Sequence, residues 1–314
     1  MTGDAEAILL TPDDLLEPGF MRQLESLRVR SSVSRPGASM GERVSRSRGS
    51  GMELADHKEY SPGDDFRMID WNVYARLDEF VVKVFETEEN LPVCILLDAS
   101  ASMGFPQGAA VTKWMAAARL AAALGYVALA NRDALTLILF AGRPTARFEA
   151  ARGRGHVREM LRLIGAYAPA DRSDFRASFL DVGMHLHRPG ICFVISDFCV
   201  ADDTAAAGAA GLGEALKGLV FYGHEVAALH VFDPLEADPG LEGEVDVEDA
   251  ETGELVPVTV RGDTVRRYRE AFEARCRAVA AACATYDANY IRLSTADSVE
   301  QTVLHRLRRE GMLE

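Results

Sequence analysis

Short apolar runs alternate with longer amphipathic segments from residue 91 onwards. Stretches such as CILL (94–97) and ICFVI (191–195) lack polar alternation, which is typical of strands buried on both faces. The longer segments repeat their apolar residues at helical spacing. This alternation predicts an α/β fold with a doubly wound, mostly parallel sheet between two layers of helices. The expected strands cover 92–97, 134–140, 190–196, 225–232 and 289–294, and the expected helices cover 112–130, 155–166, 174–187, 206–222, 264–286 and 298–310.

One segment departs from this alternation. Residues 243–260 contain two β-like runs around a turn at Thr252 and Gly253, which predicts an inserted β-hairpin within 236–262. Nine acidic residues and no Lys or Arg lie between Glu236 and Val260. This charge fits a soluble edge that avoids pairing with other chains, and it also fits a docking surface for a basic partner. Both interpretations stay open.

The first 90 residues are predicted to form an N-terminal part, followed by the sheet domain at 91–314. Apolar residues from Leu15 to Leu27 recur at roughly helical spacing behind Thr11 and Asp13, which are possible helix caps. Residues 28–50 are rich in Ser, Gly and Arg and predict a basic, solvated loop, with an anion site as the alternative. The segment from Tyr60 to the first strand of the sheet completes this N-terminal part.

Three oxygen-bearing side chains follow the first apolar run at every second position. Asp98, Ser100 and Ser102 come directly after the strand at 92–97, and Asp197 follows the strand at 190–196. Ligands of doubly wound sheets bind beyond the carboxyl ends of the strands, so neighbouring strands would bring both carboxylates to one crevice. Carboxylate and hydroxyl oxygens suit a hard divalent cation such as Mg²⁺. Asp and Ser are also common in caps and turns, and a lysine or arginine side chain that fills the space between the two aspartates would rule out the metal site.

Composition limits the classes of function. The chain has 314 residues, of which 48% are hydrophobic, and a formal net charge of -14, which argues against binding nucleic acid or anionic lipid. The acidic N-terminus does not resemble a secretory signal, and the alanine-rich stretch 114–130 carries Arg119 and is shorter than the ~20 residues of a membrane span. Five cysteines without a C-x-x-C pair fit buried thiols rather than disulfides or zinc. We therefore expect a cytoplasmic protein without membrane insertion.

A long multi-part pattern precedes the sheet domain. It reads Y-x-P-G-D-D-x-R-x-I-D-W from Tyr60 to Trp71, followed by A-R, V-K and a Glu before the first strand. This pattern resembles the signature of the bacterial domain-of-unknown-function 58 family. D-A-S-A-S at 98–102 resembles the metal-ion-dependent adhesion site of von Willebrand factor A domains. The resemblance implies a von Willebrand factor A-like, Rossmann-like fold.

The same resemblance implies a metal site and a partner. The adhesion-site pattern carries over to Asp98, Ser100, Ser102 and Asp197, and its remaining ligand, usually a threonine in G-x-T-D, corresponds to Ser173 in PADRSDF. Serine keeps the hydroxyl but lacks the methyl group that restricts a threonine rotamer. Such relatives often occur beside MoxR-type AAA+ ATPases. The resemblance thus implies a Mg²⁺-dependent (or other divalent-cation-dependent) protein-binding adaptor that acts with such an ATPase in chaperone-like complex maturation.

The family-like segment is also expected to form a small packed unit. Pro62 and Gly63 predict a turn, and the aromatic residues around them predict apolar anchors. The expected anchors are Tyr60, Trp71, Phe80 and Phe85, and the expected ion pairs join Asp64, Asp65 and Asp70 to Arg67 and Arg76.

A Mg²⁺-dependent phosphoesterase is the alternative function. Haloacid-dehalogenase-like phosphatases also present a nucleophilic aspartate after a strand, which makes Asp98 the candidate nucleophile. Those enzymes use D-x-D, whereas Ser100 stands in the second position here, and a hydroxyl is a poor acid near neutral pH. The familiar hydrolase and nucleotide-binding motifs are absent from the sequence. A binding protein without a catalytic residue is therefore the favoured hypothesis.

Overall fold

The computed structural model describes residues 9–31, 52–62, 64, 66–87, 90–106, 109, 111–186, 188–199, 205–248 and 254–314. The chain divides into two compact units, which we call the sheet unit (Met1–Val33 and Leu91–Glu314) and the signature unit (Ser34–Asn90). The described N-terminal residues 9–31 thus belong with the sheet and not with the signature segment.

Six strands form the main sheet in the order β10-β7-β6-β3-β4-β5. The first five in this order are parallel, and β5 is antiparallel to β4. The predicted mostly parallel sheet is confirmed, and the five predicted strands agree with the observed bounds to within one residue. The strands are β3 (Pro92–Asp98), β4 (Ala134–Phe140), β5 (Pro144–Ala151), β6 (Ile191–Ser196), β7 (Glu225–Phe232) and β10 (Asn289–Ser294).

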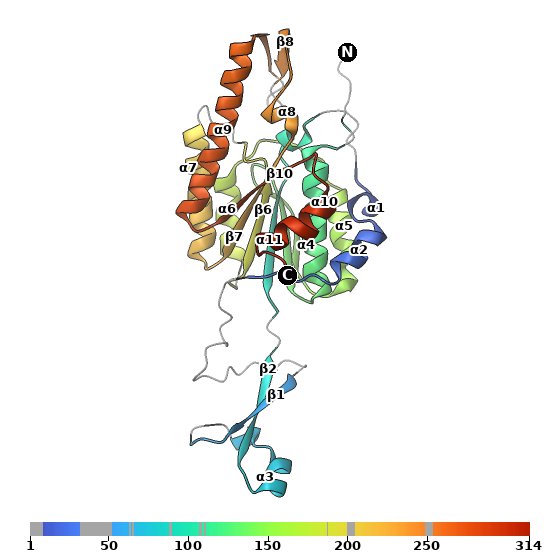
Figure 1. The fold of residues 1–314 in the computed structure, drawn as a ribbon, viewed down its shortest axis with the longest axis vertical. Coiled ribbons are helices and arrows are strands. Elements are labelled where there is room, and N and C mark those ends of the chain that lie inside the picture. Colours follow the sequence, from blue (N-terminus) through green and yellow to red (C-terminus); the bar gives the residue numbers. More distant parts are fainter. Residues whose placement is uncertain are drawn as a thin grey trace. The chain divides into compact units, whose positions relative to one another are not determined.

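Helices cover both faces of this sheet (Figure 1). Successive residues of β3 point to opposite faces, so Ile95 and Leu97 belong to one core cluster whereas Cys94 and Leu96 belong to the other. One face carries α4 (Lys113–Ala130) and α5 (Val157–Gly165), and the other carries α6 (Phe175–His185), α7 (Ala205–Phe221) and α9 (Gly262–Thr285). Among the helices that the structure describes, none combines the length and apolarity that a bilayer span needs.

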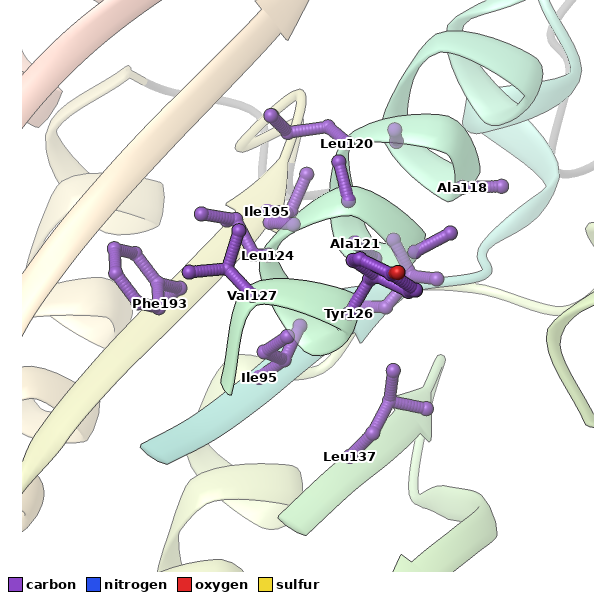
Figure 2. Packing of buried hydrophobic residues seen from close by; sticks show 14 of the residues in the cluster. Ile95, Ala118, Leu120, Ala121, Leu124, Tyr126, Val127, Leu137, Phe193 and Ile195 are labelled. Atoms are coloured by element: carbon purple, nitrogen blue, oxygen red, sulfur yellow. The ribbon is translucent and has the colours of Figure 1, made fainter. Parts of the chain in front are cut away.

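Helix α4 is the central helix of the first face. Thr112 caps its N-terminus by accepting a hydrogen bond from the backbone N–H of Met115. Its many alanines let the helix lie close to the sheet, and Leu124 and Val127 pack among Ile95, Phe193 and Ile195 (Figure 2). The expected buried helix at 112–130 is therefore confirmed.

The N-terminal segment forms two short helices, α1 (Pro12–Leu15) and α2 (Pro18–Leu24), instead of one. Pro18 has no backbone N–H, so it begins a new helix more readily than it continues one. Thr11 caps α1 as predicted. The C-terminal end contributes α10 (Val299–Gln301), a π-helical turn at Thr302–Arg306 and α11 (Leu307–Arg309), and short 3-10 segments lie at Phe66–Met68, Ala101–Gly104 and Arg154–His156.

The predicted hairpin is a separate antiparallel pair after α8 (Pro234–Ala237). Its strands are β8 (Gly243–Glu248) and β9 (Leu255–Val260), and they do not join the main sheet. The predicted turn residues Thr252 and Gly253 lie outside the described residues. We call residues 243–248 and 255–260 the acidic ribbon.

The signature unit contains an antiparallel pair, β1 (Met52–Glu59) and β2 (Val81–Thr87), and α3 (Trp71–Leu77). Trp71 and Phe80 are 58% and 47% exposed, so the prediction that they anchor a packed unit is wrong. Two strands and a two-turn helix have too little surface to enclose large rings. Tyr74 instead stacks on Phe80 with ring centroids 4.4 Å apart.

The contacts described for Asp64 and Asp70 in the signature unit are not the expected ion pairs. Asp64 pairs with Lys58 at 3.3 Å, and Asp70 caps α3 by accepting a hydrogen bond from the backbone N–H of Asn72. Gly63, Asp65 and the side chain of Phe85 lie outside the described part of the chain, and the ion pairs expected for Arg67 and Arg76 stay predictions.

Gly190 tests the register of β3 against β6. A Cβ at Gly190 would lie 2.1 Å from the backbone oxygen of Pro92, so Gly190→Ala is expected to lower the free energy of unfolding by about 1–3 kcal/mol. Gly218→Ala in α7 is the control, because no atom lies within 4 Å of its added Cβ. It should raise the free energy of unfolding by up to about 1 kcal/mol through helix propensity. Urea unfolding measures both, and equal effects would contradict the register.

Candidate functional site

The loop after β3 lies at the point where the strand order reverses. The chain runs from β3 to β4 on one side and later to β6 on the other, so β3 and β6 flank the switch point of the sheet. Backbone bonds join this loop to the segment around residue 171: Ala101 donates to the carbonyl of Asp171 at 2.9 Å, and Ala170 donates to that of Ala99 at 2.9 Å. The loop that carries Ser173 is thereby held against the loop that carries Asp98.

Asp98 is fully buried and surrounded by hydroxyl groups. Its Oδ1 accepts from the backbone N–H of Ser100 at 2.9 Å. The Ser173 hydroxyl lies 3.2 Å from Oδ1 and 3.1 Å from Oδ2, and the Ser196 hydroxyl donates to Oδ2 at 2.5 Å. Within the described residues, no lysine or arginine is hydrogen-bonded to this carboxylate.

Ser100 and Ser102 connect this group to Asp197. The two serine Oγ atoms lie 3.2 Å apart, and the Ser102 side chain contributes to lowering the pKa of Asp197. The backbone N–H of Cys199 donates to Asp197 Oδ1 at 2.9 Å. The structure therefore brings together all five residues that the sequence and the resemblance point to: Asp98, Ser100, Ser102, Ser173 and Asp197.

Lys113, the first residue of α4, is the main feature that the sequence prediction missed. Its side chain is 1% exposed, and its Nζ lies 2.6 Å from Asp197 Oδ2 and 2.6 Å from Glu236 Oε1. A cation at a helix N-terminus is unfavourable, so the two carboxylates compensate both the helix dipole and the loss of water. That position is the one signal in the sequence that could have indicated a buried partner. The Lys113 ammonium argues against a metal at Asp197, because it already neutralises that carboxylate.

The two aspartates differ in pKa for this reason. Burial raises the pKa of Asp197, but the charge of Lys113 and its hydrogen bond hold that pKa below the ordinary value. Burial and the nearby charge of Asp197 raise the pKa of Asp98 to about 6, against the hydrogen bonds from Ser196 and Ser100. The charges of Asp197 and Glu236 raise the pKa of Lys113 above its ordinary value although burial lowers it.

The donor set suits a hard cation on the Asp98 side. Carboxylate and serine oxygens converge there, whereas Asp197 already has a cationic partner. Within the described residues, no group of three or more His, Cys, Asp or Glu side chains could hold a metal ion. The candidate set is of another kind, because it combines the Asp98 carboxylate with three serine hydroxyls beside the lysine-paired Asp197, and such oxygen ligands suit Mg²⁺ better than zinc.

Comparisons with known proteins now give the family. Residues 56–281 match the family described as "Protein of unknown function DUF58". The chain belongs to this family. Uncharacterized proteins of Mycobacterium bovis and Mycobacterium tuberculosis are 28% identical to this DUF58 chain over 243 residues, which cover 76% of it and 74% of each relative.

Solved structures similar to this DUF58 chain include a conserved hypothetical protein BatB from Bacteroides thetaiotaomicron, with 16% identity, a TM-score of 0.42 and coverage of 71% of this chain and 99% of that one. An aerotolerance-related membrane protein from Bacteroides fragilis has 17% identity and a TM-score of 0.41, with coverage of 70% and 98%. At TM-scores of this size, the likeness says nothing about the function of this DUF58 chain.

Loss of the Lys113 ammonium is expected to destabilise the protein. Lys113→Met would leave Asp197 buried without a cation and should lower the free energy of unfolding by about 3–5 kcal/mol. Lys217→Met is the control, because it removes an exposed charge from α7. It should change the free energy of unfolding by less than about 0.5 kcal/mol. Urea unfolding at neutral pH in EDTA measures both. Wild-type stability in the Lys113 variant would contradict a structural role for this ion pair.

Asp98 should make the stability of the metal-free protein depend on pH. Between the ordinary pKa of 3.8 and the folded value of about 6, the unfolded chain releases a proton that the folded chain retains, so stability falls as pH rises. The expected loss is roughly 3 kcal/mol across this window. The Asp98→Asn variant should not show this loss of stability, because its amide does not titrate. Unfolding free energies measured in EDTA from pH 4 to pH 7 test this, and parallel curves for the two proteins would disprove it.

Proposed function

We propose that the sheet unit is a von Willebrand factor A-like protein-binding module. In this proposal, the Asp98 site holds a divalent cation, Mg²⁺ by preference, and binds a carboxylate of a partner protein. The observation that carries the proposal is the state of Asp98: a fully buried carboxylate with a pKa raised to about 6, ringed by serine hydroxyls and hydrogen-bonded to no lysine or arginine among the described residues. A buried carboxylate in these surroundings favours a cation.

The residues that would hold the cation are Asp98, Ser100, Ser102 and Ser173, with Asp197 beside them but already paired with Lys113. The cation would supply the positive charge that a partner's carboxylate needs. The Ser196 hydroxyl orients the carboxylate of Asp98, and Lys113 neutralises Asp197. With one of the two aspartates already neutralised, the affinity for a cation depends mainly on Asp98 and the hydroxyls, and we expect it to be modest.

The proposed partner is a MoxR-type AAA+ ATPase or its client protein, in the cytoplasm. Membership of the DUF58 family is what supports this choice, because the resemblance to that family implies that such relatives act with these ATPases. The protein would act as an adaptor in chaperone-like maturation of complexes. The phosphoesterase alternative gains no support from the site, because Ser100 stands where such phosphatases carry the acid/base aspartate.

Direct metal binding tests the first part of this proposal. Titration with Mn²⁺, followed by electron paramagnetic resonance and by competition with Mg²⁺, should show binding that the double variant Ser100→Ala/Ser102→Ala weakens by at least about tenfold, since both proposed hydroxyl ligands are lost. Ser178→Ala is the control, because this buried hydroxyl donates to the carbonyl of Ala141 instead. Equal Mn²⁺ affinity in all three proteins would contradict the site.

Partner capture tests the second part. A MoxR-type ATPase from the same organism should be retained by the wild-type protein in Mg²⁺ and released by EDTA, and the double serine variant should not retain it. Retention that persists in EDTA would contradict a metal-dependent contact.

A further inference from the structure

The acidic ribbon is an amphipathic two-stranded sheet. Its register sets Val245 opposite Val258 and Val247 opposite Val256. Since side chains alternate between the two faces of a strand, these four valines share one face. The other face carries the carboxylates of β8 with their partners on β9: Glu244 with Thr259, Asp246 with Pro257, and Glu248 with Leu255.

Much of the valine face is open to solvent. Val247 and Val256 are 45% and 48% exposed, and β8 and β9 pair with no further strand among those that the structure describes. A two-stranded ribbon alone is marginally stable in water. Carboxylates would account for solubility, but they do not account for a face of exposed valines. The ribbon therefore has the form of an incomplete sheet.

The two edges of the ribbon are not equivalent. β9 contains Pro257, which has no backbone N–H to donate to another strand, whereas β8 contains no proline. The segment that leads into the ribbon, α8 and Asp238, is held at two points. Lys113 binds Glu236, and Arg269 binds Asp238, at 2.6 Å each. β8 is thus the edge that can accept a strand.

We propose that β8 binds an extended segment of a partner protein as a third strand, and that this segment alternates aliphatic residues with lysine or arginine. Its aliphatic side chains would extend the valine face, and its cations would lie opposite Glu244, Asp246 and Glu248. A second copy of this chain is disfavoured, because it would place carboxylates opposite carboxylates. This surface is distinct from the Asp98 site and does not depend on a bound cation.

A short synthetic peptide that alternates valine and lysine tests the proposal by fluorescence anisotropy. We expect it to bind, and the triple variant Glu244→Lys/Asp246→Lys/Glu248→Lys should weaken binding by about tenfold, from three cross-strand charge pairs. The same variant should instead bind a peptide that alternates valine and glutamate. The affinity should be the same in Mg²⁺ and in EDTA, which separates this proposal from the metal site.

A matched variant controls for net charge. Glu149→Lys/Glu159→Lys/Glu300→Lys makes the same charge change at exposed positions away from the ribbon and should retain the valine–lysine peptide. In the wild-type protein, the peptide should also slow hydrogen exchange of the β8 amides, a readout that needs no variant. The proposal is overturned if a peptide with its valines and lysines in separate blocks binds equally well, if both triple variants lose binding alike, or if β8 exchange does not change.

Discussion

Two like charges buried at adjacent strand ends set the constraint on which this site depends. The parallel pairing of β3 with β6 places Asp98 and Asp197 at the same edge of the sheet, away from water. Two buried carboxylates repel each other and each loses hydration, so the fold must supply compensation. It does so unequally, with an ammonium for Asp197 and hydroxyl groups for Asp98.

This unequal compensation links distant parts of the chain. Lys113 begins the central helix of one face, Asp197 directly follows β6 in the middle of the sheet, and Glu236 begins the acidic insertion. One buried ammonium therefore joins α4, the loop after β6 and α8. Loss of Glu236 from α8 would remove one partner of Lys113. The remaining pairing of Lys113 with Asp197 would change, and with it the effect of Asp197 on the pKa of Asp98.

The proposed site and the acidic ribbon would bind by different physical means. At Asp98, a small number of buried oxygens would act through a cation of high charge density, which depends on geometry and on exclusion of water. On β8, exposed backbone groups and carboxylates would act over a longer surface, where each contact is weak and salt screens the charges. If both proposals hold, one unit carries two surfaces that differ in their dependence on salt and on a cation.

The sequence by itself determined the parallel strands and the larger helices, because continuous apolar runs and helical periodicity are local signals. It also placed Asp98 and Asp197 at strand ends, and the resemblance added Ser173. It did not indicate β5, an edge strand whose Arg147 and Glu149 interrupt the apolar pattern.

Only the tertiary structure decided which charges neutralise each other and which large rings stay exposed. Lys113 lies 84 residues from Asp197 and 123 from Glu236, and a hydrogen bond across such separations leaves no periodic trace in the sequence. The exposure of Trp71 likewise depends on how much surface its neighbours can provide. Pairing and burial are properties of packed elements, whereas the sequence pattern specifies the elements one at a time.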